Sequence, residues 1–223
     1  MKTIVVFTGA GISVESGLGT FRDSDGLWEQ YKIEDVATTE AFEKNPELVL
    51  DFYNIRRKQL LESQPNQAHC SLNKLSEKYN LQIITQNIDD LHERSGSKNV
   101  LHLHGKLVEA KSTFNDKIYP ITSANLYIGD LCEKGSQLRP NVVWFGEAVP
   151  KMTDAINITQ KADIFIVIGT SLNVYPAASL LQYTENAERI VLIDPNAEEI
   201  NGVEIIKEKA TFAVPKLVAA LLQ

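Results

Sequence analysis

The sequence contains little cysteine, no excess of positive charge and no long apolar run. Its 223 residues include two cysteines, Cys70 and Cys132, and neither belongs to a Cys-x-x-Cys pair. This excludes a disulfide framework and a zinc site built from cysteine pairs, and is typical of a reducing compartment. Lys and Arg number 22 against 29 Asp and Glu, which gives a net charge of −7. We therefore expect no broad basic surface for nucleic acid or for an anionic membrane.

The apolar runs are too short for export or membrane insertion. Four apolar residues follow Met1-Lys2-Thr3 before Thr8 is reached, whereas the apolar part of a signal peptide has about 7–15 residues. No run approaches the roughly 18 apolar residues of a membrane helix. We therefore expect a cytoplasmic protein, and its 43% hydrophobic content suffices for a buried core.

Short β-branched runs alternate with amphipathic stretches of helical length. The runs predict buried parallel strands at residues 3–8, 81–85, 100–104, 164–169 and 189–194. The amphipathic stretches predict helices at residues 47–62, 67–79, 176–184 and 212–222. This alternation predicts an α/β fold with a doubly wound, parallel, Rossmann-like sheet.

Two segments depart from the alternation. Residues 31–65 are helical and charged, and residues 106–137 are irregular and rich in turns. We expect both to form a small inserted helical and irregular module within a single domain of residues 1–223. The Rossmann-like part then comprises residues 1–30, 66–105 and 138–223. Because ligands of open α/β sheets bind at the carboxyl ends of strands, we expect a cleft between sheet and module.

A glycine-rich loop follows the first predicted strand. Gly9 and Gly11 would let the backbone approach a pyrophosphate, and a helix start would offer free N–H groups. The dinucleotide fingerprint has a third glycine where this chain has Val14, so a structural turn and a phosphate site are equally open. The later Phe21-Arg22 pair predicts either a solvated loop or a lid that excludes water.

Polar residues also follow the next two predicted strands. Asn87 and Asp89 follow residues 81–85, where such side chains commonly cap a helix but can also bind an amide ligand in a closed pocket. His104 ends residues 100–104, and His102 lies on the same face of that strand. A strand histidine is commonly a core residue, but an ordinary pKa near 6.5 also suits a general base.

Several blocks of this sequence resemble the sirtuins, the NAD-dependent protein deacylases. They occur in family order and span almost the whole chain: Gly9-Ala10-Gly11-Ile12-Ser13 with Phe21-Arg22, Thr85-Gln86-Asn87-Ile88-Asp89, His102-Leu103-His104-Gly105, Leu138-Arg139-Pro140, Phe145-Gly146-Glu147 and Gly169-Thr170-Ser171-Leu172. The resemblance implies that NAD is a co-substrate and that acylated-lysine proteins or peptides are the partners. The implied products are nicotinamide, O-acyl-ADP-ribose and free lysine.

The resemblance also implies a role for each matching position. His104 would be the general base, and Asn87 and Asp89 would act with it beside the nicotinamide. The implied NAD contacts are Gly9, Ala10, Gly11, Ser13, Phe21, Arg22, Gln86, Asn87, Asp89, Gly169, Thr170, Ser171, Asp194 and Asn196. Sirtuins usually carry Asn near Asp194, so the ribose contact there stays open. A peptide would add a strand beside Phe145, Gly146, Glu147 and Val174.

Two residues on a predicted helix are candidates for binding the acyl group. Tyr53 and Arg56 are three residues apart and share one helical face, as they also would in a helix whose arginine merely faces solvent. Tyr-x-x-Arg at this place resembles the sirtuin branch that removes succinyl, malonyl and glutaryl groups, in which the pair binds the distal carboxylate. Ala37 stands where that branch has a small residue that widens the acyl pocket. The resemblance therefore implies desuccinylation or demalonylation, with some deacetylation.

One departure concerns the structural zinc that most sirtuins hold with two cysteine pairs. The corresponding residues 106–137 contain only Cys132, and one thiolate cannot complete a tetrahedral site, so no zinc is predicted. Apolar residues could form a small core instead: Phe114, Ile118, Tyr119, Ile121, Leu126, Tyr127 and Leu131.

Other functions stay open at this point. An ADP-ribosyltransferase or an NAD glycohydrolase would share the NAD cleft without an acyl-lysine tunnel. A non-catalytic NAD sensor would not need His104. A dehydrogenase is disfavoured, because no acidic residue stands on a second strand about 20 residues after the glycines.

Overall fold

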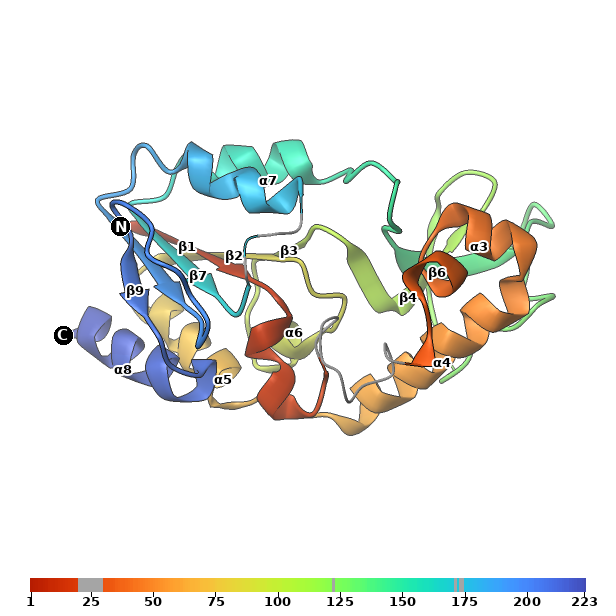
Figure 1. The fold of residues 1–223 in the computed structure, drawn as a ribbon, viewed down its shortest axis with the longest axis horizontal. Coiled ribbons are helices and arrows are strands. Elements are labelled where there is room, and N and C mark those ends of the chain that lie inside the picture. Colours follow the sequence, from red (N-terminus) through yellow and green to blue (C-terminus); the bar gives the residue numbers. More distant parts are fainter. Residues whose placement is uncertain (20–29, 122, 171, 173–174) are drawn as a thin grey trace.

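The chain forms a larger body around a parallel sheet and a smaller body of helices and short strands (Figure 1). The computed structural model describes residues 1–19, 30–121, 123–170, 172 and 175–223. Four predicted site residues lie outside the described residues: Phe21, Arg22, Ser171 and Val174.

The larger body is built on a six-stranded sheet with the order β3-β2-β1-β7-β8-β9. Its strands are β1 (Thr3–Thr8), β2 (Asn80–Thr85), β3 (Val100–His102), β7 (Ile164–Ile168), β8 (Arg189–Ile193) and β9 (Glu204–Ile206). All neighbouring strands pair in parallel. The chain runs outward from β1 in one direction and from β7 in the other, so the crevice between their carboxyl ends is the expected ligand site of a Rossmann-like sheet.

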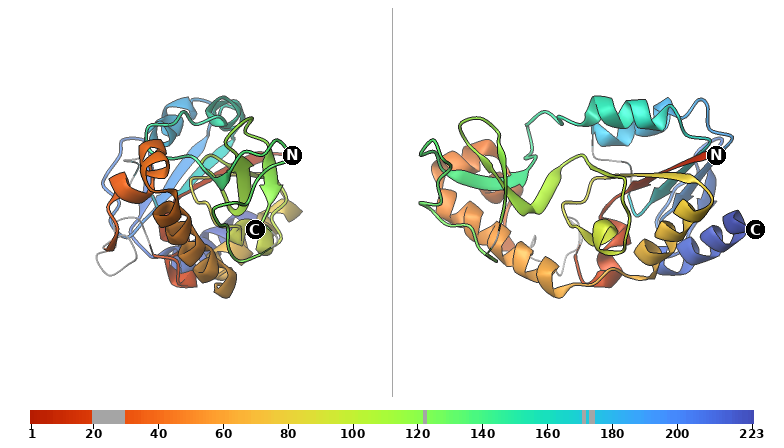
Figure 2. Two further views of the ribbon diagram at one scale, coloured as in Figure 1. Left: turned by 90° about the vertical axis from the view of Figure 1, so that its right-hand side faces the viewer. Right: turned by 180° about the vertical axis from the view of Figure 1, so that it is seen from behind.

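Helical layers cover both faces of this sheet. α5 (Gln67–Lys74) and α8 (Ala210–Leu222) lie side by side on one face, and α7 (Met152–Thr159) and η4 (Ala177–Tyr183) lie on the other (Figures 1 and 2). Ile4 and Val6 pack towards α8, whereas Val5 and Phe7 pack towards α7. Because side chains alternate along a strand, a strand that is buried on both faces has a continuous apolar run. The apolar run of residues 4–7 therefore predicted β1 from the sequence.

In the part of the chain that the structure describes, the smaller body combines three helices with an antiparallel sheet. The helices are α2 (Ile33–Val36), α3 (Thr39–Lys44) and α4 (Pro46–Glu62), and the sheet has the order β5 (Ile118–Pro120), β4 (Gly105–Ser112) and β6 (Leu138–Val142). The Asn45 side chain accepts a hydrogen bond from Leu48 N at 3.2 Å and caps α4, which begins at Pro46. This body draws on both segments that the sequence sets apart, residues 31–65 and 106–137, and also on β6.

The second half of the module differs from the expectation. The sequence predicts irregular structure for residues 106–137, but they contain most of β4 and all of β5. The predicted boundary at residue 138 is also wrong, because β6 pairs with β4 and not with the Rossmann-like sheet. Pro140 lies within β6, and prolines are disfavoured in strand interiors, which hides this element in the sequence.

The module is held by buried polar contacts as well as by apolar packing. Arg57 is 1% exposed, and its Nε donates to Leu107 O at 2.7 Å. Its Nη1 donates to Asn54 Oδ1 at 2.8 Å and to Ala124 O at 3.3 Å. The Asn54 side chain exchanges two further hydrogen bonds with the backbone of Leu126. We call Asn54 and Arg57 the α4 clasp, because they tie α4 to the segment around residue 125.

The apolar core expected for residues 106–137 is only partly present. Leu126 is buried and Ile121 packs beside it, but four of the expected core side chains are exposed: Phe114, Ile118, Tyr127 and Leu131. Two helical expectations also need correction. The loop after β1 forms the 3₁₀ turns η1 (Ala10–Ile12) and η2 (Val14–Ser16), and residues 176–184 form the 3₁₀ helix η4.

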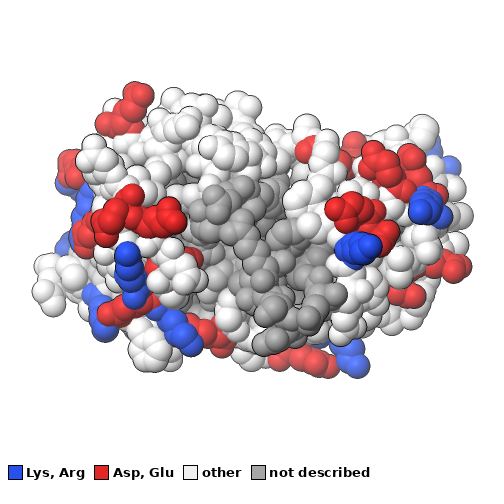
Figure 3. Space-filling model, in the orientation of Figure 1, with Lys and Arg blue, Asp and Glu red and all other residues white. Residues whose placement is uncertain are grey.

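Among the described residues, no helix has the length and apolar character to cross a membrane. On the face shown in Figure 3, charged side chains gather over the two ends of the molecule. Between these ends, the described residues visible in this view are mostly uncharged.

Candidate active site

A cavity of about 990 Å³ lies between the carboxyl edge of the large sheet and the small module. Every predicted site residue within the described part of the chain lines it. The residues from the sheet side are Gly9, Ala10, Gly11, Ser13, Gln86, Asn87, Asp89, His104, Gly169, Thr170, Asp194 and Asn196. Those from the module side and its connection are Ala37, Tyr53, Arg56, Phe145, Gly146 and Glu147.

The loops after β1 and β7 touch each other through their backbones. A Cβ added to Gly11 would lie 2.6 Å from Gly169 Cα, and Gly169 itself has φ +63°. The N–H groups of Gly9 and Gly11 donate to Ile168 O at 3.0 Å and to Gly169 O at 2.8 Å. These glycines therefore join the two loops, and their own N–H groups are bonded to the backbone of β7 and the loop after it.

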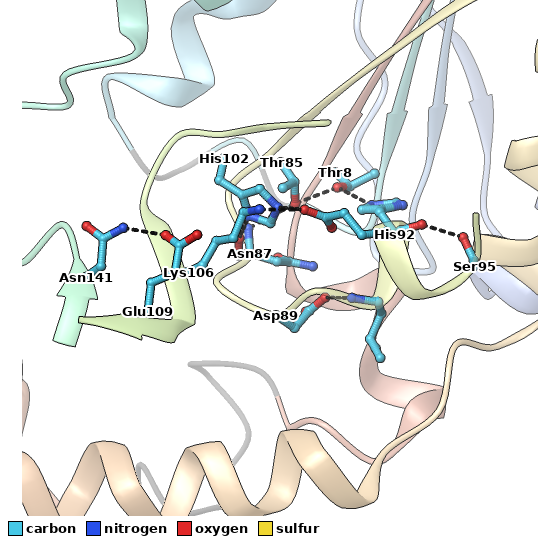
Figure 4. Close-up of polar contacts among 12 residues, drawn as sticks. Thr8, Thr85, Asn87, Asp89, His92, Ser95, His102, Lys106, Glu109 and Asn141 are labelled. Carbon is cyan, nitrogen blue, oxygen red and sulfur yellow. Dashed lines mark hydrogen bonds and ion pairs between the residues drawn. The ribbon is translucent and has the colours of Figure 1, made fainter. Parts of the chain in front are cut away.

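Asn87 and Asp89 form a buried polar wall beside this loop (Figure 4). Asn87 Nδ2 donates to Gly9 O at 3.1 Å, and Ser13 Oγ donates to Asp89 Oδ2 at 3.0 Å. Asp89 Oδ1 also accepts from Leu91 N at 3.1 Å. Burial raises the pKa of Asp89, although the bonds from Leu91 and Ser13 oppose this shift. Both residues cap and orient local backbone, and both also line the cavity.

A network of hydroxyl and imidazole groups supports this wall from behind. Thr8 Oγ1 lies 2.8 Å from Thr85 Oγ1 and 3.0 Å from His92 Nε2 (Figure 4). Thr85 Oγ1 in turn accepts the Asn87 N–H at 3.0 Å. The His92 ring meets the His69 ring edge to face at a centroid distance of 4.9 Å. Burial lowers the pKa of both histidines, to about 4 for His69.

Of the two strand histidines, the structure brings His104 and not His102 to the cavity. His104 Nδ1 lies 2.9 Å from Gln86 O. A carbonyl only accepts, so Nδ1 carries the proton and the lone pair of the neutral ring is at Nε2. Burial lowers the pKa of His104, against the opposing effect of Gln86 O. The ring is therefore neutral at physiological pH, and its Nε2 lone pair can accept a proton.

His102 has a structural role instead. Its Nδ1 lies 3.0 Å from Asn87 O and its Nε2 lies 2.9 Å from Glu93 Oε1 (Figure 4). Lys106 Nζ also lies 2.9 Å from the same Glu93 oxygen. Burial would raise the pKa of Glu93, but the bonds from His102 and Lys106 lower it to about 2. His102 thus fixes the backbone at Asn87, next to the catalytic candidates.

The remaining sheet-side candidates complete the rim of the cavity. Gln86 Nε2 donates to Thr170 Oγ1 at 3.1 Å, which links the ends of β2 and β7. Asp194 Oδ1 accepts the N–H of Asn196 at 2.8 Å and shapes the turn after β8. Hydroxyl, carboxamide and carboxylate groups thus follow three strands and suit the ribose and phosphate groups of a dinucleotide.

Tyr53 and Arg56 face the same cavity from α4. Tyr53 is 2% exposed, and burial raises its pKa to about 12, so the phenol keeps its proton. Burial lowers the pKa of Arg56, whose Cζ lies 5.8 Å from the Phe52 ring centroid. Arg56 is half-buried and lines the cavity. Ala37 is 3% exposed and lines the same cavity.

The Phe145-Gly146-Glu147 turn connects the acyl side with the expected peptide side. The Phe145 N–H donates to Ala37 O at 3.0 Å. The Glu147 carboxylate accepts from Arg139 Nη2 at 2.7 and 2.9 Å and from Trp144 N at 2.8 Å. Glu147 therefore anchors the turn, so its predicted contact with substrate would use an already bonded carboxylate.

Sequence reasoning missed Trp144. This residue is 2% exposed and lines the cavity, and its Nε1 donates to Tyr53 Oη at 3.0 Å. Its position directly before Phe145-Gly146-Glu147 was the available signal. A buried tryptophan requires an acceptor for its N–H, but only the fold reveals which one.

The residues of the module do not fit a structural zinc. Cys132 Sγ accepts a hydrogen bond from Ser112 Oγ at 3.3 Å. Within the described ranges, no group of three His, Cys, Asp or Glu side chains is placed to hold a metal ion. A tetrahedral site needs four ligands, which the Cys132 thiol and its serine partner do not supply.

Comparisons with known proteins agree with this fold and cavity. The profile of the Sir2 family matches residues 9–176. The NAD-dependent protein deacylase of Helicobacter pylori strain 26695 is 48% identical over 226 residues, which cover 100% of this chain and 99% of that protein.

Solved structures agree as well. The crystal structure of a Sir2 homolog–NAD complex has a TM-score of 0.89 at 41% identity and covers 99% of this chain and 90% of its own. A complex described as Sir2–p53 peptide–NAD⁺ has a TM-score of 0.79 at 31% identity, with 99% and 92% covered. The chain therefore belongs to the Sir2 family, the sirtuins.

Proposed function

We propose that this protein is an NAD-dependent lysine deacylase that removes succinyl and malonyl groups in preference to acetyl groups. The observation that carries the proposal is the convergence of three groups in one cavity: His104, the Asn87–Asp89 wall and the Tyr53–Arg56 pair. The reaction class is supported by the deacylase relative and by the NAD and peptide complexes described above.

NAD, when bound, would supply an ADP-ribosyl group with nicotinamide as the leaving group. Asn87 and Asp89 offer amide and carboxylate groups to the nicotinamide carboxamide, and the carboxylate favours the positive charge that develops on the sugar. His104 Nε2 accepts a proton from a ribose hydroxyl, because Gln86 O holds the other nitrogen in its protonated form. The products are nicotinamide, free lysine and O-acyl-ADP-ribose.

The preference for acidic acyl groups rests on the α4 side of the cavity. The Tyr53 phenol stays protonated and can donate a hydrogen bond, and Arg56 presents a planar cation beside it. These two donors suit the distal carboxylate of a succinyl or malonyl chain, and such charge-assisted bonds are strong in a buried site. The small Ala37 leaves room for the longer chain.

Nicotinamide release tests the reaction class. The protein is mixed with NAD and a succinyl-, malonyl-, acetyl- or unmodified lysine peptide. We expect release only with acylated peptide, and faster release with succinyl than with acetyl peptide. Release without peptide would instead support the NAD glycohydrolase alternative, and release with transfer to unmodified protein would support an ADP-ribosyltransferase.

Arg56→Met tests the acyl preference. Loss of a charge-assisted contact should weaken transition-state binding of the succinyl peptide by roughly 1.5–3 kcal/mol, which lowers kcat/KM about 10–150-fold. The acetyl peptide should then react faster than the succinyl peptide. Lys58→Met is the matched control, since Lys58 is exposed on the same helix and does not line the cavity. Equal loss on succinyl and acetyl peptides would show that Arg56 does not read the carboxylate.

A further inference from the structure

The indole of Trp144 is bonded to the tyrosine of the acyl site. Its Nε1 lies 3.0 Å from Tyr53 Oη, and the two ring centroids are 6.5 Å apart. Both side chains are 2% exposed, and both residues line the cavity. The indole N–H only donates, so Tyr53 is the acceptor in this bond.

This contact decides what the Tyr53 hydroxyl can do next. A phenol has one proton to donate, and here one of its lone pairs is already taken by Trp144. The hydroxyl proton cannot point along the Trp144 bond, so it is left for an acceptor within the cavity. A carboxylate at the end of an acyl chain is such an acceptor, whereas the methyl end of an acetyl group is not.

Trp144 is itself held on several sides. Arg139 Cζ lies 3.7 Å from the centroid of the indole, which is the geometry of a cation–π contact. The Glu147 carboxylate bonds both Arg139 and the Trp144 N–H of the backbone. The Phe42 ring packs at 5.3 Å from the indole centroid. The indole therefore presents its Nε1–H in one direction.

We propose that Trp144 is a positioning residue for acyl specificity, which orients the Tyr53 hydroxyl as a donor to the distal carboxylate of the substrate. The inference rests on the proposed deacylase function and adds a residue that acts through Tyr53. Phenylalanine at position 144 would keep an aromatic ring between Arg139 and Phe42 but would have no donor for Tyr53. The Tyr53 hydroxyl would then be free to rotate away from the substrate.

A double-mutant cycle tests this inference. Trp144→Phe, Tyr53→Phe and the double variant are compared with wild type in kcat and KM for succinyl and acetyl peptides. We expect Trp144→Phe to lower the succinyl-to-acetyl ratio of kcat/KM by about 5–10-fold, mainly through KM for the succinyl peptide. In the Tyr53→Phe background the same change should alter the ratio by less than about twofold, because the hydroxyl it acts on is already absent.

Phe42→Leu is the matched control, because it changes the packing against the indole without removing its N–H. It should lower the succinyl-to-acetyl ratio much less than Trp144→Phe. An equal loss of both activities in Trp144→Phe, or an undiminished effect in the Tyr53→Phe background, would overturn the inference. A wild-type protein without desuccinylase activity would overturn the proposed acyl preference together with this inference, whereas a desuccinylase that ignores Trp144→Phe would overturn this inference alone.

Fluorescence provides a second measurement in case Trp144→Phe does not fold. The chain has two tryptophans, so a Trp28→Phe background leaves Trp144 as the only one. Tyr53→Phe in that background should shift the Trp144 emission to shorter wavelength, because its N–H loses the acceptor. An unchanged emission would contradict the bond on which the inference depends.

Discussion

The two walls of the cavity are held in place by different kinds of contact. On the sheet side, Gly11 and Gly169 meet through their backbones, and main-chain hydrogen bonds join the loops. On the module side, the position of α4, which carries Tyr53 and Arg56, depends on side chains: the α4 clasp and the Trp144–Tyr53 bond. The sheet side, which would bind the dinucleotide, thus has no room for a side chain at Gly11 or Gly169. On the module side, which would select the acyl group, single side-chain substitutions can alter the geometry of the cavity.

The largest effect is expected from the α4 clasp. Arg57→Ala removes three hydrogen bonds from a buried cation and leaves carbonyl oxygens of Leu107 and Ala124 without this donor. We expect a loss of about 4 kcal/mol in the free energy of unfolding, measured by urea denaturation. Lys58→Ala on the same helix is exposed and should change it by less than about 0.5 kcal/mol. Similar losses in the two variants would refute the side-chain account of the module.

Gly11→Ala tests the backbone contact of the sheet wall. The new Cβ would lie 2.6 Å from Gly169 Cα, and neither backbone can move without disturbing β1 or β7. We expect a loss of about 3 kcal/mol in the free energy of unfolding, together with loss of NAD binding. Gly17→Ala is the control, because Gly17 has φ +89° but, among the described residues, no neighbour within 4 Å of the added Cβ, so it should lose only about 1 kcal/mol. A milder effect at Gly11 than at Gly17 would contradict the close contact.

Acid should act on the sheet side through His69. Burial lowers its pKa from 6.5 to about 4, so between these values the unfolded chain binds a proton that the folded chain does not. The stability contributed by neutral His69 is therefore complete above pH 6.5 and is lost as the pH falls towards 4, with a slope of up to about 1.4 kcal/mol per pH unit.

His69→Gln isolates this contribution. Glutamine at the third position of α5 can keep the capping bond to Asn66 N, but it does not titrate. The free energy of unfolding, measured by urea denaturation from pH 4.5 to pH 6.5, should depend on pH less steeply in the variant by about one proton. His92, which faces His69 at 4.9 Å, remains in both proteins, but its own pKa is lowered by burial and by His69, so the change in slope reports on the two rings together. An unchanged slope would show that His69 is not the group that titrates.

The smallest effect is expected from metal removal. Since one thiol and a serine occupy the place expected for zinc, elemental analysis should find less than stoichiometric zinc. A chelator should leave the melting temperature unchanged. A zinc content near one per chain would mean that the module is held by metal and would overturn the contrast between the walls.

The sequence predicted the parts of the fold in which local pattern and tertiary role agree. Strands β1 and β7 are buried on both faces, and their unbroken apolar runs identified them almost to the residue. Strand β9 and helix α7 were not predicted, because β9 has three residues and α7 has eight, with little pattern in either. Strands β4 and β6 were obscured by half-buried positions and by Pro140.

The candidate site was predicted mainly through motif order, and the structure brings its described members to one cavity. What the sequence could not provide were the partners. Which histidine can act as the base depends on tertiary structure: the His102 ring contacts Glu93, whereas the His104 ring lines the cavity. This difference follows from the turn between β3 and β4. The commitment of the Gly9 and Gly11 N–H groups to the β7 loop likewise requires the tertiary structure.

The hydrogen bond from Phe145 N to Ala37 O has a consequence for substrate selection. Ala37, on the proposed acyl side of the cavity, and Phe145, on the proposed peptide side, share this main-chain connection. A bulkier side chain at position 37 would narrow the cavity and, through this bond, would also displace Phe145, beside which the peptide would lie under the proposed function. Under the proposed function, a change of acyl range through position 37 would therefore also alter which peptide sequences the protein accepts.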